Sequence, residues 1–219
     1  MRFVRTEPMT AAPASWTGSR RSVLIGGLSL ASVGLGGVGL VGCASNTPIQ
    51  QVPEIRFQDE EPLRIAVDVV DIMDETAPEA SSPEARGAFP TPPHKAMRNW
   101  GEDRLEAEPL GSGVARYRIT QASVARELGD RPSGTDRLFG AEQRQTFTVR
   151  VAAELEVRRN DGGLVNAVSA NSWGQESFAA DADRFDLQRA TDAFMRRVMA
   201  DFDREMEAAI RANIANLLA

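Results

Sequence analysis

The spacing of hydrophobic residues after residue 62 predicts strands separated by loops and helices. The first such segment places apolar side chains at every second position, at Leu63, Ile65, Val67 and Val69. A period of two is typical of a strand with one buried face. Residues 74–90 are rich in proline, glutamate, serine and alanine and contain little to bury, so we expect a long mobile loop there.

A short helix is predicted after this loop. Thr91 is a candidate cap, and Pro92 suits the first helical position, where the missing N–H of proline costs no hydrogen bond. Met97, Trp100 and Leu105 would then face the core.

The next strand is predicted to contain an irregularity. Ala115, Tyr117 and Ile119 share one face, but the apolar positions change phase at Ala122 and Val124. A β-bulge, which inserts one extra residue into a strand, produces such a phase change.

A hairpin follows, after a segment from 128 to 145 that we expect to be a second mobile loop. Its first strand has an apolar face made by Phe147, Val149, Val151, Ala153, Leu155 and Val157. Residues 160–163 read Asn-Asp-Gly-Gly and predict a tight turn, because asparagine and glycine accept positive φ angles. A return strand is expected from Leu164 to about Phe178.

The last segment predicts a long amphipathic helix after Asp183. Its apolar positions recur every three or four residues, at Leu187, Ala190, Phe194, Val198, Phe202, Met206, Ile210, Ile214 and Leu217. The order of elements therefore predicts an α+β fold. We expect a small, mainly antiparallel sheet of about four strands, with a short helix and a long C-terminal helix on one face.

Composition narrows the range of functions. Residues 1–42 hold four of the 25 basic residues but only one of the 31 acidic ones, so the remainder is more acidic than the net charge of −6 suggests. An acidic surface repels nucleic acid, and we expect no nucleic-acid partner. The single cysteine and single histidine exclude an internal disulfide and a metal centre built from several such ligands, so we expect no metal and no cofactor.

The N-terminal region has the three parts of an export signal. Arg20 and Arg21 precede an uncharged apolar run from Val23 to Leu40, and small residues lead into Cys43. The run contains many glycines, which disfavour a permanent helix. An uncleaved membrane-spanning helix is the alternative that this pattern leaves open.

Leu40, Val41, Gly42 and Cys43 resemble the lipobox of bacterial lipoproteins. The resemblance implies that Cys43 receives a diacylglyceryl group and that the chain is cut just before it. The new amino terminus would then also be acylated, for example with palmitate. Two or three acyl chains make membrane attachment effectively permanent.

The same region suggests a route and a destination. The arginine pair resembles a twin-arginine export signal, although Val23 stands where that signal has phenylalanine, so ordinary export stays open. Ala44 follows the cysteine where aspartate would imply retention in the inner membrane, which favours the inner leaflet of the outer membrane. We expect a signal peptide at 1–42, a lipidated flexible tether at 43–62 and one periplasmic domain at 63–219.

Candidate catalytic chemistry is sparse. His94 follows two prolines and is interpreted as a surface or capping residue. Asp68, Asp71, Glu154 and Glu156 are candidates for a carboxylate pair, but their spacing selects no pair, and solvated strand faces explain them better. We therefore predict no catalytic residue.

Several residues are candidate partner contacts. Leu138 and Phe139 lie at the centre of the loop at 128–145. Trp173 lies in a polar segment, where core packing is the favoured interpretation and partner or glycan contact the alternative. Ile214 lies near the end of a helix long enough to overhang the sheet. Met195, Met199 and Met206 are interpreted as core residues, with a lipid or partner groove as the alternative.

By element order alone, residues 63–216 resemble the auxiliary lipoproteins of ABC-type lipid transporters and the activator lipoproteins of penicillin-binding proteins. The leading hypothesis is a lipid-anchored, non-enzymatic accessory protein or adaptor of another envelope complex. A lipid-binding or lipid-transfer component and, less favoured, a periplasmic hydrolase are the alternatives.

Overall fold

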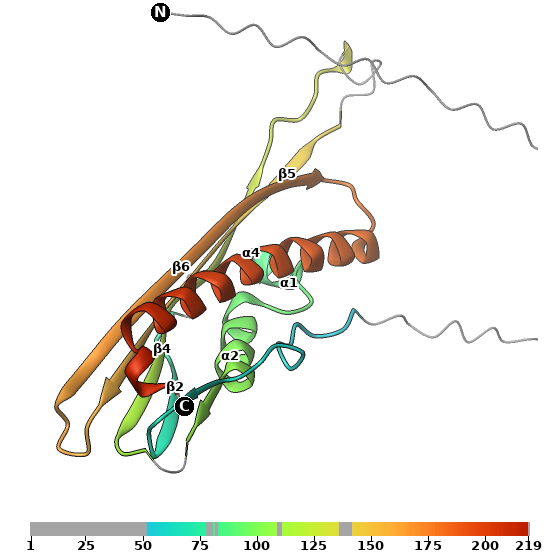
Figure 1. Cartoon of the computed structure of the whole chain (residues 1–219). Helices are drawn as coiled ribbons and strands as arrows, with labels where there is room; N and C mark the ends of the chain where they lie inside the picture. Colours follow the sequence, from blue (N-terminus) through green and yellow to red (C-terminus); the bar gives the residue numbers. More distant parts are fainter. Residues whose placement is uncertain (1–51, 78–80, 82, 109–110, 136–141, 219) are drawn as a thin grey trace, which may run out of the picture. The chain divides into compact units, whose positions relative to one another are not determined.

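The computed structural model describes residues 52–77, 81, 83–108, 111–135 and 142–218, which belong to the unit Pro48–Ala219 (Figure 1). Its strands are β1 (Leu63–Ile65), β2 (Val69–Asp74), β3 (Leu105–Ala107), β4 (Val114–Leu128), β5 (Arg144–Arg158) and β6 (Leu164–Ala179). Its helices are α1 (Pro83–Gly87), α2 (Pro93–Arg104), α4 (Arg184–Asn213) and a final 3-10 turn, η2 (Ala215–Leu217). None of these helices is long and apolar enough to cross a membrane.

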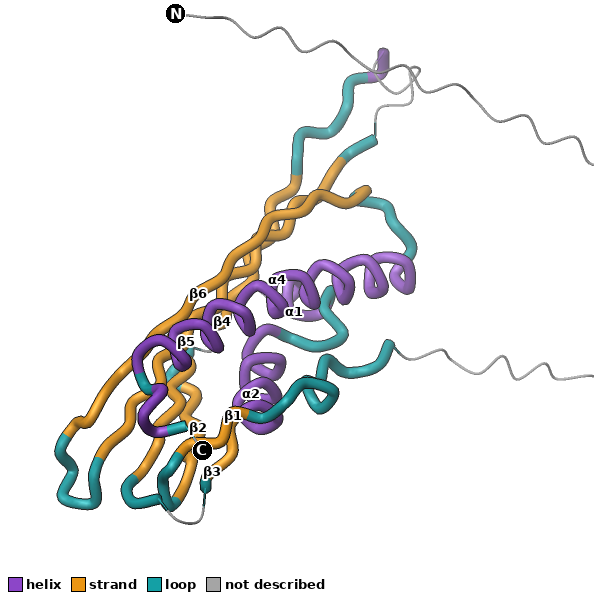
Figure 2. Tube along the Cα trace, viewed as in Figure 1, coloured by secondary structure: helices purple, strands orange, loops and turns teal. Residues whose placement is uncertain are grey.

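The main sheet has the strand order β2-β4-β5-β6. β2 runs parallel to β4, whereas β4, β5 and β6 form an antiparallel meander. β1 and β3 make a separate parallel pair. The α+β fold class is confirmed, with the helices gathered on one face of the main sheet (Figure 2).

The predicted hairpin and bulge are confirmed. β4 changes register between Ile119 and Gln121. The β5–β6 turn contains Gly162 at φ 84°, a left-handed conformation that glycine adopts without strain. All six predicted apolar positions of β5, from Phe147 to Val157, are buried.

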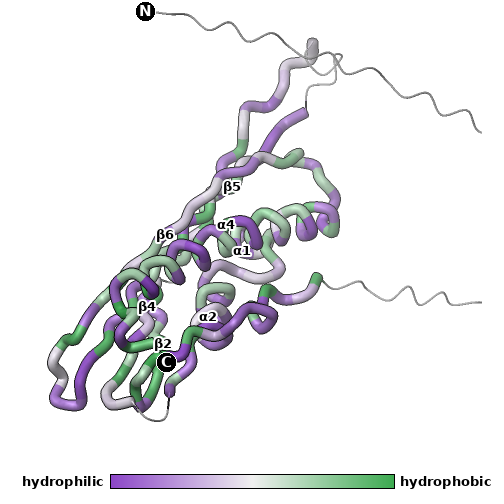
Figure 3. The backbone as a smooth tube through the Cα atoms, viewed as in Figure 1, coloured by the Kyte–Doolittle hydropathy of each residue, from purple (hydrophilic) through white to green (hydrophobic). Residues whose placement is uncertain are grey.

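The predicted C-terminal helix is also confirmed. Asp183 caps α4 by accepting a hydrogen bond from the N–H of Phe185 at 2.8 Å. Hydrophobic and hydrophilic positions alternate around its turns (Figure 3), and Phe194, Phe202 and Ile210 are buried against the rest of the domain. Ring contacts join the layers, because Trp100 of α2 lies between Tyr117 and Phe202 at centroid distances of 5.2 and 5.3 Å.

The single strand predicted at 63–69 is in fact two. Asp68 exchanges backbone and side-chain hydrogen bonds with Gly113, at 2.9 and 3.0 Å, and the chain bends there. β1 therefore pairs with β3 and β2 with β4, and Val69 is 43% exposed rather than buried.

Two predicted flexible segments contain ordered structure. Ile55, in the expected tether, is buried, and its N–H donates to the hydroxyl of Thr91 at 3.1 Å. Thr91 therefore does not cap α2, whose N-cap is Pro92. The expected loop at 74–90 includes α1, and Phe89 packs edge-on against Phe147 at 5.6 Å, so the described part of this loop contributes to the core.

The segment expected to be a loop near 128–145 connects β4, which ends at Leu128, to β5, which begins at Arg144. The Gly129 N–H donates to the Arg144 carbonyl at 2.8 Å, next to these strand ends.

Candidate functional site

The face of the main sheet turned away from the helices carries the alternate strand residues that do not enter the core. On β5 these are the even-numbered residues, since the odd-numbered residues from 147 to 157 are buried. Strand pairing aligns them with the corresponding residues of β4 and β6. We call this surface the open face.

One end of the open face is charged. Arg118 bonds to Glu154 at 2.5 Å and lies 3.1 Å from Glu156, which also accepts from Arg158 at 2.7 Å. The hydrogen bond from Arg158 lowers the pKa of Glu156. Glu154 and Glu156, two of the candidates for a carboxylate pair, therefore share Arg118 as an ion-pair partner on one face of the sheet.

The middle of the open face carries one charged residue, Arg150, and its far end carries Glu127 and Arg144. Trp173 of β6 is 65% exposed and lies directly opposite Arg150 of β5, which in turn lies opposite Ser123 of β4. The flanking rows are Gln121–Ala152–Asn171 and Ala125–Thr148–Gln175. The favoured interpretation of Trp173 as a core residue is wrong, because Val168, Ala170 and Ser172 are the β6 residues that face the helices.

The outer edge of β6 borders this middle region of the open face. The N–H of Ala180 donates to the carbonyl of Gln143 at 2.8 Å, and antiparallel pairing continues from there in register. Ala180 and Gln143 are therefore a hydrogen-bonded pair, and such pairs recur at every second residue of an antiparallel ladder. Even-numbered residues of β6 thus bond to β5, and odd-numbered residues direct their backbone N–H and carbonyl groups away from β5. Within the described part of the chain, no strand pairs with this edge.

The edge lacks the features that usually block strand addition. The residues that direct backbone groups outward at its centre are Ser169, Asn171, Trp173 and Gln175, none of which is charged or proline. Natural edge strands are commonly protected by lysine, proline or bulges. Backbone donors and acceptors are therefore available over the length of a short peptide.

The other predicted site residues have separate outcomes. The candidate lipidation and export residues Leu40, Val41, Gly42, Cys43, Arg20 and Arg21, and the candidate contacts Leu138 and Phe139, lie outside the described residues. Ile214 is only 1% exposed, so its assignment as a partner contact is wrong. The chain turns at Ile214 into η2, which folds the helix end back onto the core instead of letting it overhang.

The remaining predicted residues are explained by the fold. His94 is exposed on α2, in agreement with a surface histidine. Met195, Met199 and Met206 are all buried in the core, as favoured. Met199 also contributes to one side of a cavity of about 430 Å³ between residues 55–60 and α4.

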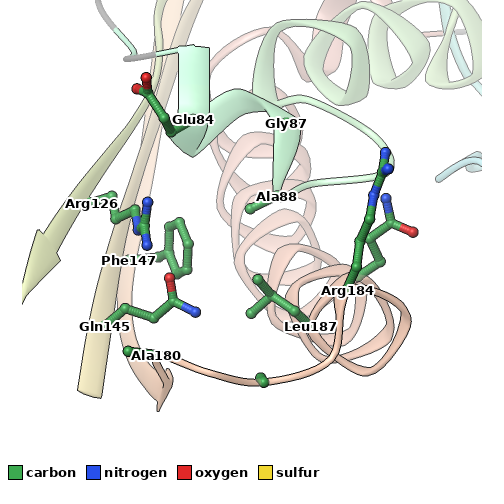
Figure 4. Close-up of a pocket in the computed structure, with 11 residues that line it drawn as sticks. Glu84, Gly87, Ala88, Arg126, Gln145, Phe147, Ala180, Arg184 and Leu187 are labelled. Atoms are coloured by element: carbon green, nitrogen blue, oxygen red, sulfur yellow. The ribbon is translucent and has the colours of Figure 1, made fainter. Parts of the chain in front are cut away.

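A second cavity, of about 210 Å³, lies between the end of the sheet and the start of α4 (Figure 4). Arg126, Gln145 and Phe147 line its sheet side, and Arg184 and Leu187 line its helix side. No group of three or more histidine, cysteine or acidic residues in the described ranges could hold a metal ion.

Comparison with known proteins finds similarity to solved structures but no match by sequence. No family model and no curated protein matches the chain. Among solved structures, a minor lipoprotein from Acinetobacter baumannii aligns with a TM-score of 0.31 and 11% sequence identity, covering 70% of this chain and 96% of that chain. A similarity this distant supports no argument about function, which we base on the chain's own residues.

Proposed function

We propose that this chain is an exported lipoprotein anchored through Cys43, whose domain is a non-enzymatic adaptor for another protein of the cell envelope. The anchoring half of the proposal is supported by the arginine pair, the apolar run and the lipobox-like residues 40–43. We place the anchor in the inner leaflet of the outer membrane, because alanine follows the cysteine.

The adaptor half is supported chiefly by the free edge of β6 beside Trp173. An extended peptide can add a strand to such an edge, with affinity from backbone hydrogen bonds and specificity from alternate side chains. An apolar side chain of the peptide on the open face would lie against Trp173, which is exposed and central to the edge. Large exposed aromatic residues are enriched at the centres of protein interfaces.

The position of α4 favours an extended peptide, rather than a second copy of this domain, as the partner that adds to the β6 edge. Gly174 lies so close to α4 that a Cβ there would be 2.8 Å from Phe194, and the Asn166 side chain donates to the carbonyl of Asn213 at 2.5 Å. The helix therefore covers β6 itself. If two copies paired edge to edge, their β6 strands would lie about 4.8 Å apart. The α4 helix that covers each β6 would then be closer to its copy than the interaxial distance of about 8–10 Å that packed helices need.

Anchoring is tested by mass analysis of the N-terminal peptide of membrane-extracted protein, beside Cys43→Ser. We expect a diacyl or triacyl mass on Cys43 and release of the variant from membranes. An intact segment 1–42 without lipid would contradict the anchoring proposal and indicate a signal-anchored protein.

Partner docking is tested by placing a photo-crosslinking amino acid at Gln175 in cells and identifying the adducts by mass spectrometry. Asn171→Pro removes an outward N–H without touching the β5–β6 bonds, so we expect it to abolish the adduct while the domain stays folded. Asn171→Thr is the matched control and should retain the adduct. Equal adducts from both variants, or none from the wild type, would contradict docking at this edge.

A further inference from the structure

The cavity at the end of the sheet contains a cation that has no ion-pair partner among the described residues. Arg126 continues the buried row of β4 after Ala122 and Val124, so its side chain enters the helix-covered side of the sheet. Its Nε is buried and makes no hydrogen bond, and no ion pair to a described residue neutralises its guanidinium. A buried charged donor that is left unpaired is unfavourable, so a bound anion would be stabilising at this position.

The opposite side of the cavity adds a second cation. Arg184, the first residue of α4, extends along the helix side, and no ion pair joins it to any residue in the described ranges (Figure 4). The one carboxylate among the described lining residues, Glu84, points away from Gln145 and Leu187. The described lining of the cavity therefore carries two arginines and one glutamate, and the glutamate lies at its periphery.

The inner surface of the cavity combines an amide with apolar groups. Gln145 is 2% exposed, and its amide nitrogen donates to the carbonyl of Ala179 at 3.0 Å. Phe147 is fully buried beside it, and Leu187 faces them from α4. A ligand that fits this lining has a charged end and a short apolar body.

The larger cavity, beside residues 55–60, offers no comparable cation. Its three lining arginines are all paired: Arg196 with Asp192 at 2.8 Å, Arg204 with Asp201, and Arg56 with Asp103. Unpaired charge thus distinguishes the smaller cavity, although the larger one has twice the volume, about 430 against about 210 Å³.

We propose that this cavity binds a small organic monoanion, a carboxylate with a short apolar body. The carboxylate pairs with the guanidinium of Arg126, whose planar fork matches it, and the apolar body lies against Phe147 and Leu187. Two arginines and one glutamate leave a net charge of one, which favours a monoanion over a doubly charged phosphate.

The test uses the full chain in detergent, titrated by calorimetry with hexanoate, hexanol and inorganic phosphate. We expect saturable binding of hexanoate, with hexanol and phosphate each weaker by about tenfold or more. Arg126→Gln should weaken hexanoate by about tenfold while leaving the fold intact. The matched control is Arg189→Gln, an exposed arginine of α4 paired with Asp186, which should leave hexanoate binding unchanged.

Three results would overturn the proposal: hexanol binding as tightly as hexanoate, phosphate binding more tightly than hexanoate, or full affinity in Arg126→Gln. If that variant does not fold, the arginine Nε–H resonances of the wild type give the answer. Hexanoate, but not hexanol, should shift the Arg126 signal, and an unmoved signal would refute the site. No partner protein is present, so the result is independent of the adaptor proposal.

Discussion

Arg104 of α2 donates from Nε to Asp203 of α4 at 2.8 Å, across 99 residues of sequence. The arginine is only 2% exposed, and its other nitrogens reach Glu207, at 2.6 Å, and the backbone carbonyl of Glu61. Asp203 also accepts from the indole N–H of Trp100 at 2.7 Å. This network joins α2, α4 and the chain before β1.

Removing Arg104 should destabilise the domain strongly. Arg104→Met leaves Asp203 and Glu207 without their buried counter-charge, and we expect a loss of about 3 kcal/mol in the free energy of unfolding, measured with urea. Asp201→Asn, which breaks the exposed pair with Arg204, should cost less than about 1 kcal/mol. Similar losses in the two variants would show that the buried network contributes no more than a surface pair.

The free energy of unfolding should fall in mild acid because Glu207 becomes protonated. The hydrogen bond from Arg211, aided by the charge of Arg104, lowers the pKa of Glu207 below its ordinary value of 4.5. A lowered folded-state pKa stabilises the fold above the unfolded-state pKa, and this contribution is lost as the pH falls through the folded value.

The check is the unfolding free energy between pH 7 and pH 3. Glu207→Gln should reduce its decline with falling pH, whereas Glu205→Gln, an exposed glutamate of the same helix, should not. An unchanged pH profile in Glu207→Gln would show that Glu207 does not contribute to the pH dependence of the unfolding free energy.

Gly174 should not tolerate a side chain. A Cβ there would lie 2.8 Å from Phe194 and 2.9 Å from Val198, both of them buried, so α4 would have to move away from β6. We expect Gly174→Ala to cost about 1–3 kcal/mol in unfolding free energy. Gly134→Ala, where a Cβ meets nothing within 4 Å, should be nearly neutral, and equal effects would disprove the close approach.

Tyr117→Phe should be neutral or stabilising. The hydroxyl of Tyr117 is buried without a hydrogen-bond partner among the described residues, and burial raises its pKa. Removing an unpaired buried hydroxyl relieves a desolvation penalty of about 1–3 kcal/mol while the ring keeps its packing on Trp100. A higher midpoint of thermal unfolding is expected, and a clearly lower one would reveal a hydrogen bond to this hydroxyl.

The elements with strong local patterns were predictable. The apolar face of β5, the Asn-Asp-Gly-Gly turn and the three- and four-residue spacing of α4 each depend on residues close in sequence, and each is confirmed. The bulge after Ile119 was predictable for the same reason, since an inserted residue shifts the phase of the pattern. The signal and lipobox-like residues are also local features, and their roles stay predictions.

The exposure of Trp173 was not predictable from its neighbours. Both faces of β6 carry small or polar residues, with Ser172 and Gly174 on one side and Asn171 and Gln175 on the other. Only the packing of Phe194 and Val198 against Gly174 decides which side is buried.

The sequence by itself therefore determined the types and order of most elements, because the periodic patterns that encode them extend over a few residues. Tertiary structure alone decided the break at Asp68, the burial of Ile55 and of Ile214, and the lack of a hydrogen-bond partner for the Arg126 Nε among the described residues. Each of these depends on contacts between segments that are distant in sequence, and the free energy of such contacts cannot be inferred from a local pattern.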